Sequence, residues 1–124
     1  MNKLFFNKGL SRFVLLIVLI FSSSVLANSA TFTVTKIVDT NDGTCNTDCS
    51  LREAVAAANT AVTDDVIEFD PALFGSAQTI KLDGEELRLF ANFGGLTING
   101  TGANLLTIDG DNRSRIFLFF QMPL

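Results

Sequence analysis

The sequence contains no histidine, tryptophan or tyrosine, and it has only two cysteines. Without histidine the chain lacks the commonest general base, and it cannot form Ser-His-Asp or Cys-His nucleophile pairs. Two cysteines are too few for a four-thiolate zinc site. Basic residues are also scarce, since 9 Lys and Arg stand against 13 Asp and Glu, for a net charge of −4. This balance argues against a nucleic-acid partner, which would require a basic face.

Residues 1–27 have the three-part pattern of a secretory signal peptide. A basic stretch without acids is followed by nine consecutive apolar residues, 13–21, and then by three serines. A transmembrane anchor would need about 20 apolar residues, so this run is too short to be one. We predict cleavage after Ala27 and export to the extracellular space, the cell surface or the outer membrane. Any membrane association would come from export or from an anchor beyond the C-terminus.

Removal of the leader changes the character of the chain. Residues 28–124 number 97, with 6 basic and 13 acidic residues, so the mature net charge is −7. A chain of this length forms one small domain whose single core is only marginally sufficient. Export would also place the two cysteines in a compartment where a disulfide can form.

The start of the mature chain predicts a strand, a loop and a helix. Residues 31–35 alternate apolar and polar and are rich in β-branched side chains, as in a strand, and residues 36–38 extend it. After a loop rich in turn formers, Ser50-Leu51-Arg52-Glu53 fits the capping box, in which Ser50 and Glu53 cap each other's backbone amides. The predicted helix, residues 50–59, is too short to be stable alone and must pack on another element. A short strand follows at residues 66–69.

Pairs of aliphatic residues two positions apart recur along the rest of the chain and predict short strands. The steps between pairs are 7 to 10 residues, and turn residues follow each of the first four: Ile80/Leu82, Leu87/Leu89, Leu96/Ile98, Leu106/Ile108 and Ile116/Leu118. Asn-Gly and Asp-Gly turns favour hairpins and an antiparallel meander. Two segments have nearly identical sequences, Leu-Thr-Ile-Asn-Gly and Leu-Thr-Ile-Asp-Gly. This repetition favours a solenoid, in which similar strands stack on one another. The pattern alone leaves both arrangements open.

Three stretches resemble the CSLREA domain, which lies at the N-terminus of exported bacterial proteins with parallel β-helix repeats. They are Asp42-Gly43-Thr44-Cys45, the string from Asp48 to Asn59 that contains Cys-Ser-Leu-Arg-Glu-Ala, and Asp65 to Asp70. The resemblance covers roughly residues 31–117. It implies a mainly β fold: the start of a right-handed parallel β-helix (solenoid) with a short N-terminal capping α-helix. Arg52 is then expected to bind carbonyl or acidic groups at the end of the β-helix.

These patterns divide the chain into four regions. They are the signal peptide, 1–27; an N-terminal cap region, 28–78; the first β-helix coils, 79–118; and an atypical apolar tail, 119–124. The tail is apolar on both faces and lacks turn residues after it. It reads either as a fully buried strand or as foreign sequence after a frameshift or truncation, and we favour the second interpretation.

Cys45 and Cys49 are expected to form a structural disulfide between the loop and the start of the helix. A redox or metal pair would usually have C-x2-C spacing and further soft ligands, which this chain lacks. The acidic loop 39–48 fails the EF-hand pattern, because glycine is fifth and Ser50 twelfth when counted from Asp39. A calcium site of another kind stays open as an alternative to solvated turn residues. We otherwise predict no metal and no cofactor.

One cluster hints at catalysis: Asp109, Asp111, Arg113 and Arg115. Glycosidases need two carboxylates at a set separation, and parallel β-helix lyases combine acidic calcium ligands with a basic residue. The same residues also make an ordinary turn with nearby arginines, so we assign no catalytic residue and lean toward a protein that is not an enzyme.

The leading hypothesis is a structural or adhesive role. The chain would be the capping and first-coil segment of a longer secreted or cell-surface β-helix protein. The full-length solenoid would bind surface glycans or host or cell-envelope proteins. The alternatives are a carbohydrate-active enzyme with a pectate-lyase-like fold and a self-contained small secreted β-protein.

Overall fold

The computed structural model describes residues 28–91 and 94–121. The predicted leader and its cleavage site at Ala27 lie outside these residues. The described chain is mainly β, with two helices among seven strands. The elements in order are β1 (Thr31–Val34), α2 (Leu51–Thr60), β2 (Asp65–Phe69), α3 (Pro71–Phe74), β3 (Gln78–Lys81), β4 (Leu87–Ala91), β5 (Leu96–Ile98), β6 (Leu106–Asp109) and β7 (Phe117–Gln121).

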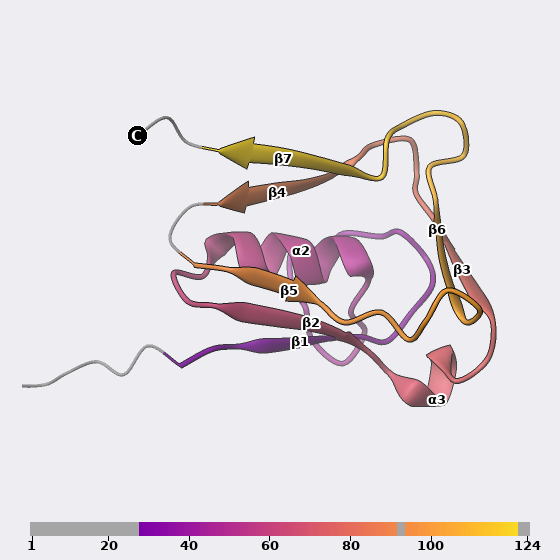
Figure 1. Ribbon diagram of the computed structural model, residues 1–124, viewed down its shortest axis with the longest axis horizontal. Coiled ribbons are helices and arrows are strands. Elements are labelled where there is room, and N and C mark those ends of the chain that lie inside the picture. Colours follow the sequence, from indigo (N-terminus) through magenta and orange to yellow (C-terminus); the bar gives the residue numbers. More distant parts are fainter. Residues whose placement is uncertain (1–27, 92–93, 122–124) are drawn as a thin grey trace, which may run out of the picture.

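All strand pairs between these elements are parallel (Figure 1). One sheet has the order β1-β2-β5, and the others are the pairs β3-β6 and β4-β7. We call β2, β3 and β4 the first pass and β5, β6 and β7 the second pass, because each strand of the second pairs with its counterpart in the first. Asp65 lies opposite Leu96, Gln78 opposite Leu106, and Leu87 opposite Phe117. The antiparallel meander left open by the sequence is therefore wrong.

The glycine turns form corners between sheets and not hairpins within one. Asp83-Gly84 lies between β3 and β4, and Asp109-Gly110 lies where β6 ends, before β7; neither pair of strands is hydrogen-bonded together. Gly84 has a φ of +85°, in the left-handed region that glycine adopts without strain. Gly110 is buried, and an added Cβ would clash with the carbonyl oxygen of Ser114. Corners of this kind let like strands stack on one another.

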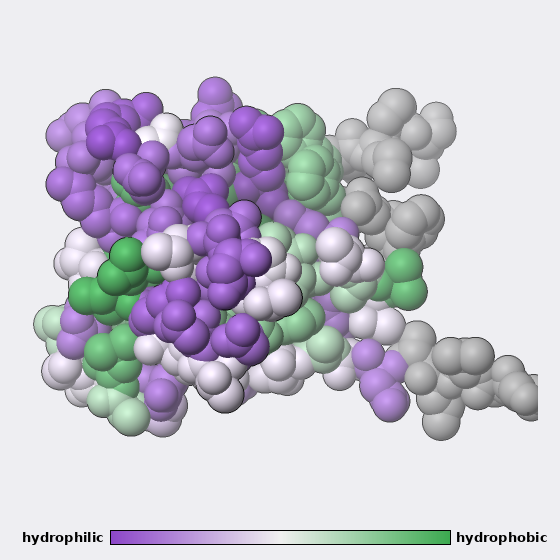
Figure 2. Space-filling view, turned by 180° about the vertical axis from the view of Figure 1, so that it is seen from behind, coloured by the Kyte–Doolittle hydropathy of each residue, from purple (hydrophilic) through white to green (hydrophobic). Residues whose placement is uncertain are grey.

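The core lies between the strands of the first pass and α2. α2 contacts β1, β2 and β4, and Figure 1 shows it between the β1-β2-β5 sheet and the β4-β7 pair. The buried apolar residues are Val34, Cys49, Leu51, Ala54, Val55, Ile67, Phe69, Phe74, Ile80, Leu82 and Leu87. Seen from behind, the molecule is largely hydrophilic; strongly apolar atoms gather on the side of β3 and β6, and paler, less hydrophobic ones lie near the end of β7 (Figure 2). No helix among the described residues is both long and apolar enough to cross a membrane.

The first strand is shorter than the prediction of residues 31–38. β1 ends at Val34 because the next amide, of Thr35, donates to the carbonyl of Cys49 (2.8 Å) and so leaves the sheet. The side chain of Lys36 forms ion pairs with the carboxylates of Asp48 and Glu53. Val38 makes only an isolated parallel bridge to Lys81.

A second difference is α3, a helical turn directly after the strand predicted at residues 66–69. Asp70 caps this helical turn by accepting the amide of Ala72 (2.9 Å), and Pro71 occupies its first position. This is a recognised helix-start signal. The turn buries Phe74 completely and places its ring edge-on to Phe69, with 5.1 Å between centroids.

The last strand has a different phase from the predicted Ile116/Leu118 pair. Register with β4 places Phe117 opposite Leu87 and Phe119 opposite Leu89, whereas Leu118 lies opposite Arg88. β7 continues to Gln121, so part of the predicted atypical tail pairs with β4. Phe119 is 74% exposed, and the reading of this stretch as a fully buried strand is therefore wrong for the chain described here.

Candidate capping site

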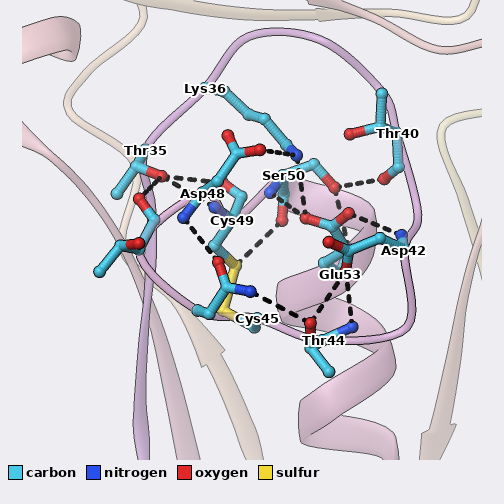
Figure 3. The surroundings of a disulfide bond; sticks show 12 residues. Thr35, Lys36, Thr40, Asp42, Thr44, Cys45, Asp48, Cys49, Ser50 and Glu53 are labelled. Carbon is cyan, nitrogen blue, oxygen red and sulfur yellow. Dashed lines mark hydrogen bonds and ion pairs between the residues drawn. A yellow bond between two sulfur atoms is a disulfide. The ribbon is translucent and has the colours of Figure 1, made fainter.

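The loop before α2 is closed by a disulfide between Cys45 and Cys49 (Figure 3). The predicted pairing is thus present. Thr35, the residue after β1, holds the end of this loop close to the strand. Its hydroxyl accepts the amide of Cys49 (2.9 Å) and donates to the carbonyl of Thr47 (3.1 Å). The disulfide and these contacts bring the chain to the start of α2 in a defined direction.

Ser50 and Glu53 form a capping box at the N-terminus of α2. Ser50 Oγ accepts the amide of Glu53 (3.0 Å), and Glu53 Oε2 accepts the amide of Ser50 (2.7 Å). Both residues are almost completely buried. Ser50 Oγ also donates to the carbonyl of Thr40 (2.6 Å), and Glu53 Oε1 accepts the amide of Asp42 (2.9 Å). The helix cap therefore also fastens the preceding loop, as Figure 3 shows.

Lys36 supplies the positive charge beside this buried carboxylate. Its Nζ lies 3.3 Å from Glu53 Oε2 and 3.1 Å from Asp48 Oδ2. Burial alone would raise the pKa of Glu53, but the amides of Ser50 and Asp42 and the Lys36 ammonium together lower it. Burial would likewise lower the pKa of Lys36, and its contacts with Asp48 and Glu53 raise it instead. Both groups are therefore charged at neutral pH.

Arg52 joins α2 to two other segments. Its Nε and Nη2 make a bidentate pair with Asp39, at 2.8 and 2.6 Å. The same guanidinium donates to the carbonyl oxygens of Glu85 (2.8 Å) and Glu86 (3.2 Å), in the corner between β3 and β4. Asp39 also accepts the amide of Asp83 (2.8 Å). Arg52 thus binds the carboxylate of Asp39 and two backbone carbonyl groups, which are the two kinds of partner expected from the sequence.

The buried face of α2 completes the site. Leu51, Ala54 and Val55 are at most 3% exposed, whereas Ala56 on the same helix is exposed. Small side chains let the helix lie close to β1, β2 and β4. The arrangement covers the apolar inner faces of the first pass and holds that cover by the capping box, the disulfide loop and the Arg52–Asp39 pair.

The acidic corner between β6 and β7 is joined to the first pass by ion pairs. Lys81 lies 2.7 Å from Asp111, and Arg113 lies 3.1 Å from Asp83. The hydrogen bond and charge of Lys81 lower the pKa of Asp111. Asp109 accepts the amide of Asp111 (2.8 Å), which is a turn contact. These contacts connect one pass to the next.

The described residues hold no group of three or more Cys, Asp or Glu placed to bind a metal ion. Comparison of the chain with protein-family models, curated proteins and solved structures found no match. The resemblance to the CSLREA domain therefore rests on the residues quoted for it.

Sequence reasoning missed three partners in this site. The sequence places Asp39 and Asp42 in the acidic loop 39–48 and Lys36 in the first strand, yet these residues contact Arg52 and Glu53. Their contacts span 11 to 17 positions and depend on how the loop folds back, so local periodicity carries no sign of them. The one available signal is an arginine and a glutamate in the first turn of a short helix, since such charges require partners if the helix is buried.

Proposed function

We propose that this chain is the N-terminal capping and first-coil segment of an exported bacterial cell-surface protein built as a right-handed parallel β-helix. In this role α2 and its disulfide loop close one end of the coil. Further passes of the same protein add at the other end, on β5, β6 and β7. The role is structural: it starts the coil and prevents strands from adding at the closed end.

The contrast in burial between the two passes carries this proposal. In the first pass Ile67, Ile80 and Leu87 are at most 1% exposed; α2 packs against β2 and β4, and the second pass lies along all three strands. Their register partners Ile98, Ile108 and Phe117 are only partly buried. A partly exposed apolar residue at a position matching a fully buried one marks a place where one more layer would fit.

The pairing distances also support a coil. Counterpart strands are 28 to 31 residues apart in the sequence, and all of their pairs are parallel. A parallel connection of this length needs a crossover, and such crossovers are right-handed in almost all proteins. The leader pattern in residues 1–27 supports export. The resemblance to the CSLREA domain supports a location on a bacterial cell surface.

The full-length protein would offer a long surface to its partner. We infer surface glycans or host or cell-envelope proteins as the classes of partner, because β-helices present extended faces of repeated side chains. Binding by the whole protein, and not by this segment alone, is the proposed adhesive activity.

Two experiments test the proposal. The first is to sequence the gene beyond the codon for Leu124 and to translate all three frames. We expect further passes with aliphatic pairs and glycine corners at a repeat of about 30 residues, the length of known solenoid repeats. A downstream region without such repeats in any frame would contradict the role as a first segment.

The second experiment tests export. The chain is expressed with its own leader in a bacterial host, and the N-terminus of the product is determined by mass spectrometry. We expect a product outside the cytoplasm that begins at Asn28. Ala27→Asp should block cleavage, because the position before the cut requires a small residue. Retention of the unprocessed wild-type chain in the cytoplasm would overturn the export part of the proposal.

A further inference from the structure

The carboxyl group of Asp65, at the start of β2, is buried but only half satisfied. Asp65 is 2% exposed. Its Oδ1 accepts the backbone amide of Ala30 (3.0 Å) and the hydroxyl of Thr63 (2.9 Å). Its Oδ2 is buried as well, and it has no hydrogen-bond partner among the described residues. Because buried carboxyl oxygens nearly always accept a hydrogen bond, Oδ2 is the place for a further donor.

No side-chain cation of the described residues pairs with this carboxyl group. The ion pairs of the described Lys and Arg residues all go to other acids, and none involves Asp65 or its neighbour Asp64. Asp64 Oδ1 accepts only the amide of Gly95 (2.7 Å). Two adjacent acidic side chains without a cation attract any positive charge that comes within reach.

Removal of the leader creates a positive charge close to this place in the chain. Cleavage after Ala27 converts the backbone nitrogen of Asn28 from a neutral peptide amide into an α-ammonium group. Asn28 lies only two residues before Ala30, and two residues span at most about 7 Å. Ala30 is itself fixed beside Asp65, because its amide donates to Oδ1 and its carbonyl accepts the amide of Val66 (2.9 Å).

The two residues before Ala30 are able to turn back toward β2. Asn28 and Ser29 are exposed and precede β1, outside any helix or strand (Figure 1). An ammonium group carries three donors and no acceptor, so it suits a site made only of carboxyl oxygens. A hydrogen bond between an ammonium and a carboxylate is also stronger than one between neutral groups.

We propose that the α-ammonium of Asn28, formed when the leader is removed, binds Oδ2 of Asp65. This inference rests on the export and cleavage in the proposed function. The contact fastens the first residue of the mature chain to the start of β2 and completes the hydrogen bonding of the buried carboxyl group. The precursor cannot form it, because its nitrogen at this position is uncharged and carries the leader. The fold therefore becomes more stable when the leader is removed.

The test removes the terminal charge from the exported chain without touching the core. In Asn28→Gln the processed chain begins with glutamine, whose α-amino nitrogen attacks its own side-chain amide carbon, forms a neutral lactam ring and releases ammonia. One preparation can thus be melted before and after the charge is lost. We expect cyclisation to lower the melting temperature by at least about 4 °C, the shift that a modest loss of stability causes in a domain of this size.

Two further variants make the test specific. Asn28→Ala is the matched control, because it keeps the ammonium and cannot cyclise; its melting temperature should not change over the same incubation. In the double variant Asn28→Gln/Asp65→Asn, cyclisation should have no effect, since the carboxylate that binds the ammonium has been replaced. Circular dichroism checks that the double variant is folded. If it is not, the ¹³C chemical shift of the Asp65 carboxyl carbon in Asn28→Gln is compared before and after cyclisation, and it should change.

The outcomes separate this inference from the proposed function. A melting temperature that does not fall on cyclisation, an equal fall in the double variant, or an unchanged ¹³C shift would overturn the inference and leave export intact. Mass spectrometry gives the first residue of each product. A wild-type product that begins at a residue other than Asn28 would overturn both the inference and the predicted cleavage site.

Discussion

The two passes have nearly the same pattern of strands and corners, yet they differ in what lies above and below them. The first pass lies between α2 and the second pass, and its inner residues Ile67, Ile80 and Leu87 are fully buried. Among the described residues the second pass is covered on one side only, and Phe119, at a position equivalent to the partly buried Leu89, is largely exposed. Burial in this protein therefore depends on the position of a layer in the stack more than on the local sequence.

The largest expected effect comes from breaking the cover over the first pass. Ala54→Asp places a charge at a position that is 0% exposed, against apolar strands. An unpaired buried charge typically costs about 3–5 kcal/mol, so this variant should lose most of its stability. Ala56→Asp changes an exposed residue of the same helix and should cost under about 0.5 kcal/mol. Urea unfolding measures the free energy of unfolding of both variants. Equal losses of this free energy would show that α2 does not cover the first pass.

The next prediction compares register partners directly. Ile67→Ala should destabilise the fold by about 3 kcal/mol, because Ile67 is fully buried and its removal leaves a cavity. Ile98→Ala, at the partner position in β5, should cost only about 1 kcal/mol, since that site is partly open. Denaturant titrations give both values. If the two costs matched, the second pass would be as fully covered as the first.

Glu53→Gln should cost about 2 kcal/mol at pH 7, because it removes the buried charge that pairs with Lys36. The pKa of Glu53 is lowered in the folded state, so its contribution is complete above the unfolded pKa and is lost as the pH falls through the folded one. The gap between wild type and variant should therefore narrow below about pH 4. Thermal melts from pH 7 to pH 3 measure it, and a gap that does not change with pH would contradict the assigned charge.

The smallest effect is expected between the passes. Lys81 and Asp111 form a partly exposed ion pair, with Lys81 at 59% side-chain exposure. Solvent screens such exposed pairs, so Lys81→Met should change the melting temperature only slightly. A loss of stability as large as that of Ile67→Ala would mean that the corner ion pairs, and not the strand pairing, hold the two passes together.

The elements with a local signal were predictable from the sequence. Ser50 and Glu53 indicate the start of a helix, and the helix begins at Leu51. The aliphatic pairs indicate strands at the right places, because alternation is a property of neighbouring residues. The parallel pairing was left undecided, since Asp-Gly serves a hairpin and a corner equally well.

The remaining features depend on contacts that are distant in the sequence. The phase of β7 follows from its register with β4, and both Ile116/Leu118 and Phe117/Phe119 are apolar, so the sequence cannot choose between them. The bond from Thr35 to Cys49 ends β1 early, although the strand pattern continues to Val38. α3, which is not among the predicted elements, does have a local signal in Asp70-Pro71.

The parallel pairing has a consequence for how the chain reaches this structure. Among the described strands only β1 and β2 pair with the next strand along the chain, and their register partners are 35 residues apart, as in Thr31 and Val66. Such non-local topologies fold slowly, because long loops must close before any pairing is rewarded. During synthesis β1 and α2 emerge before any strand of either pass, so both are available to pack against the later strands as these emerge in order. The growing polypeptide would thus fold from its N-terminal side, with each later strand pairing with a strand that is already in place.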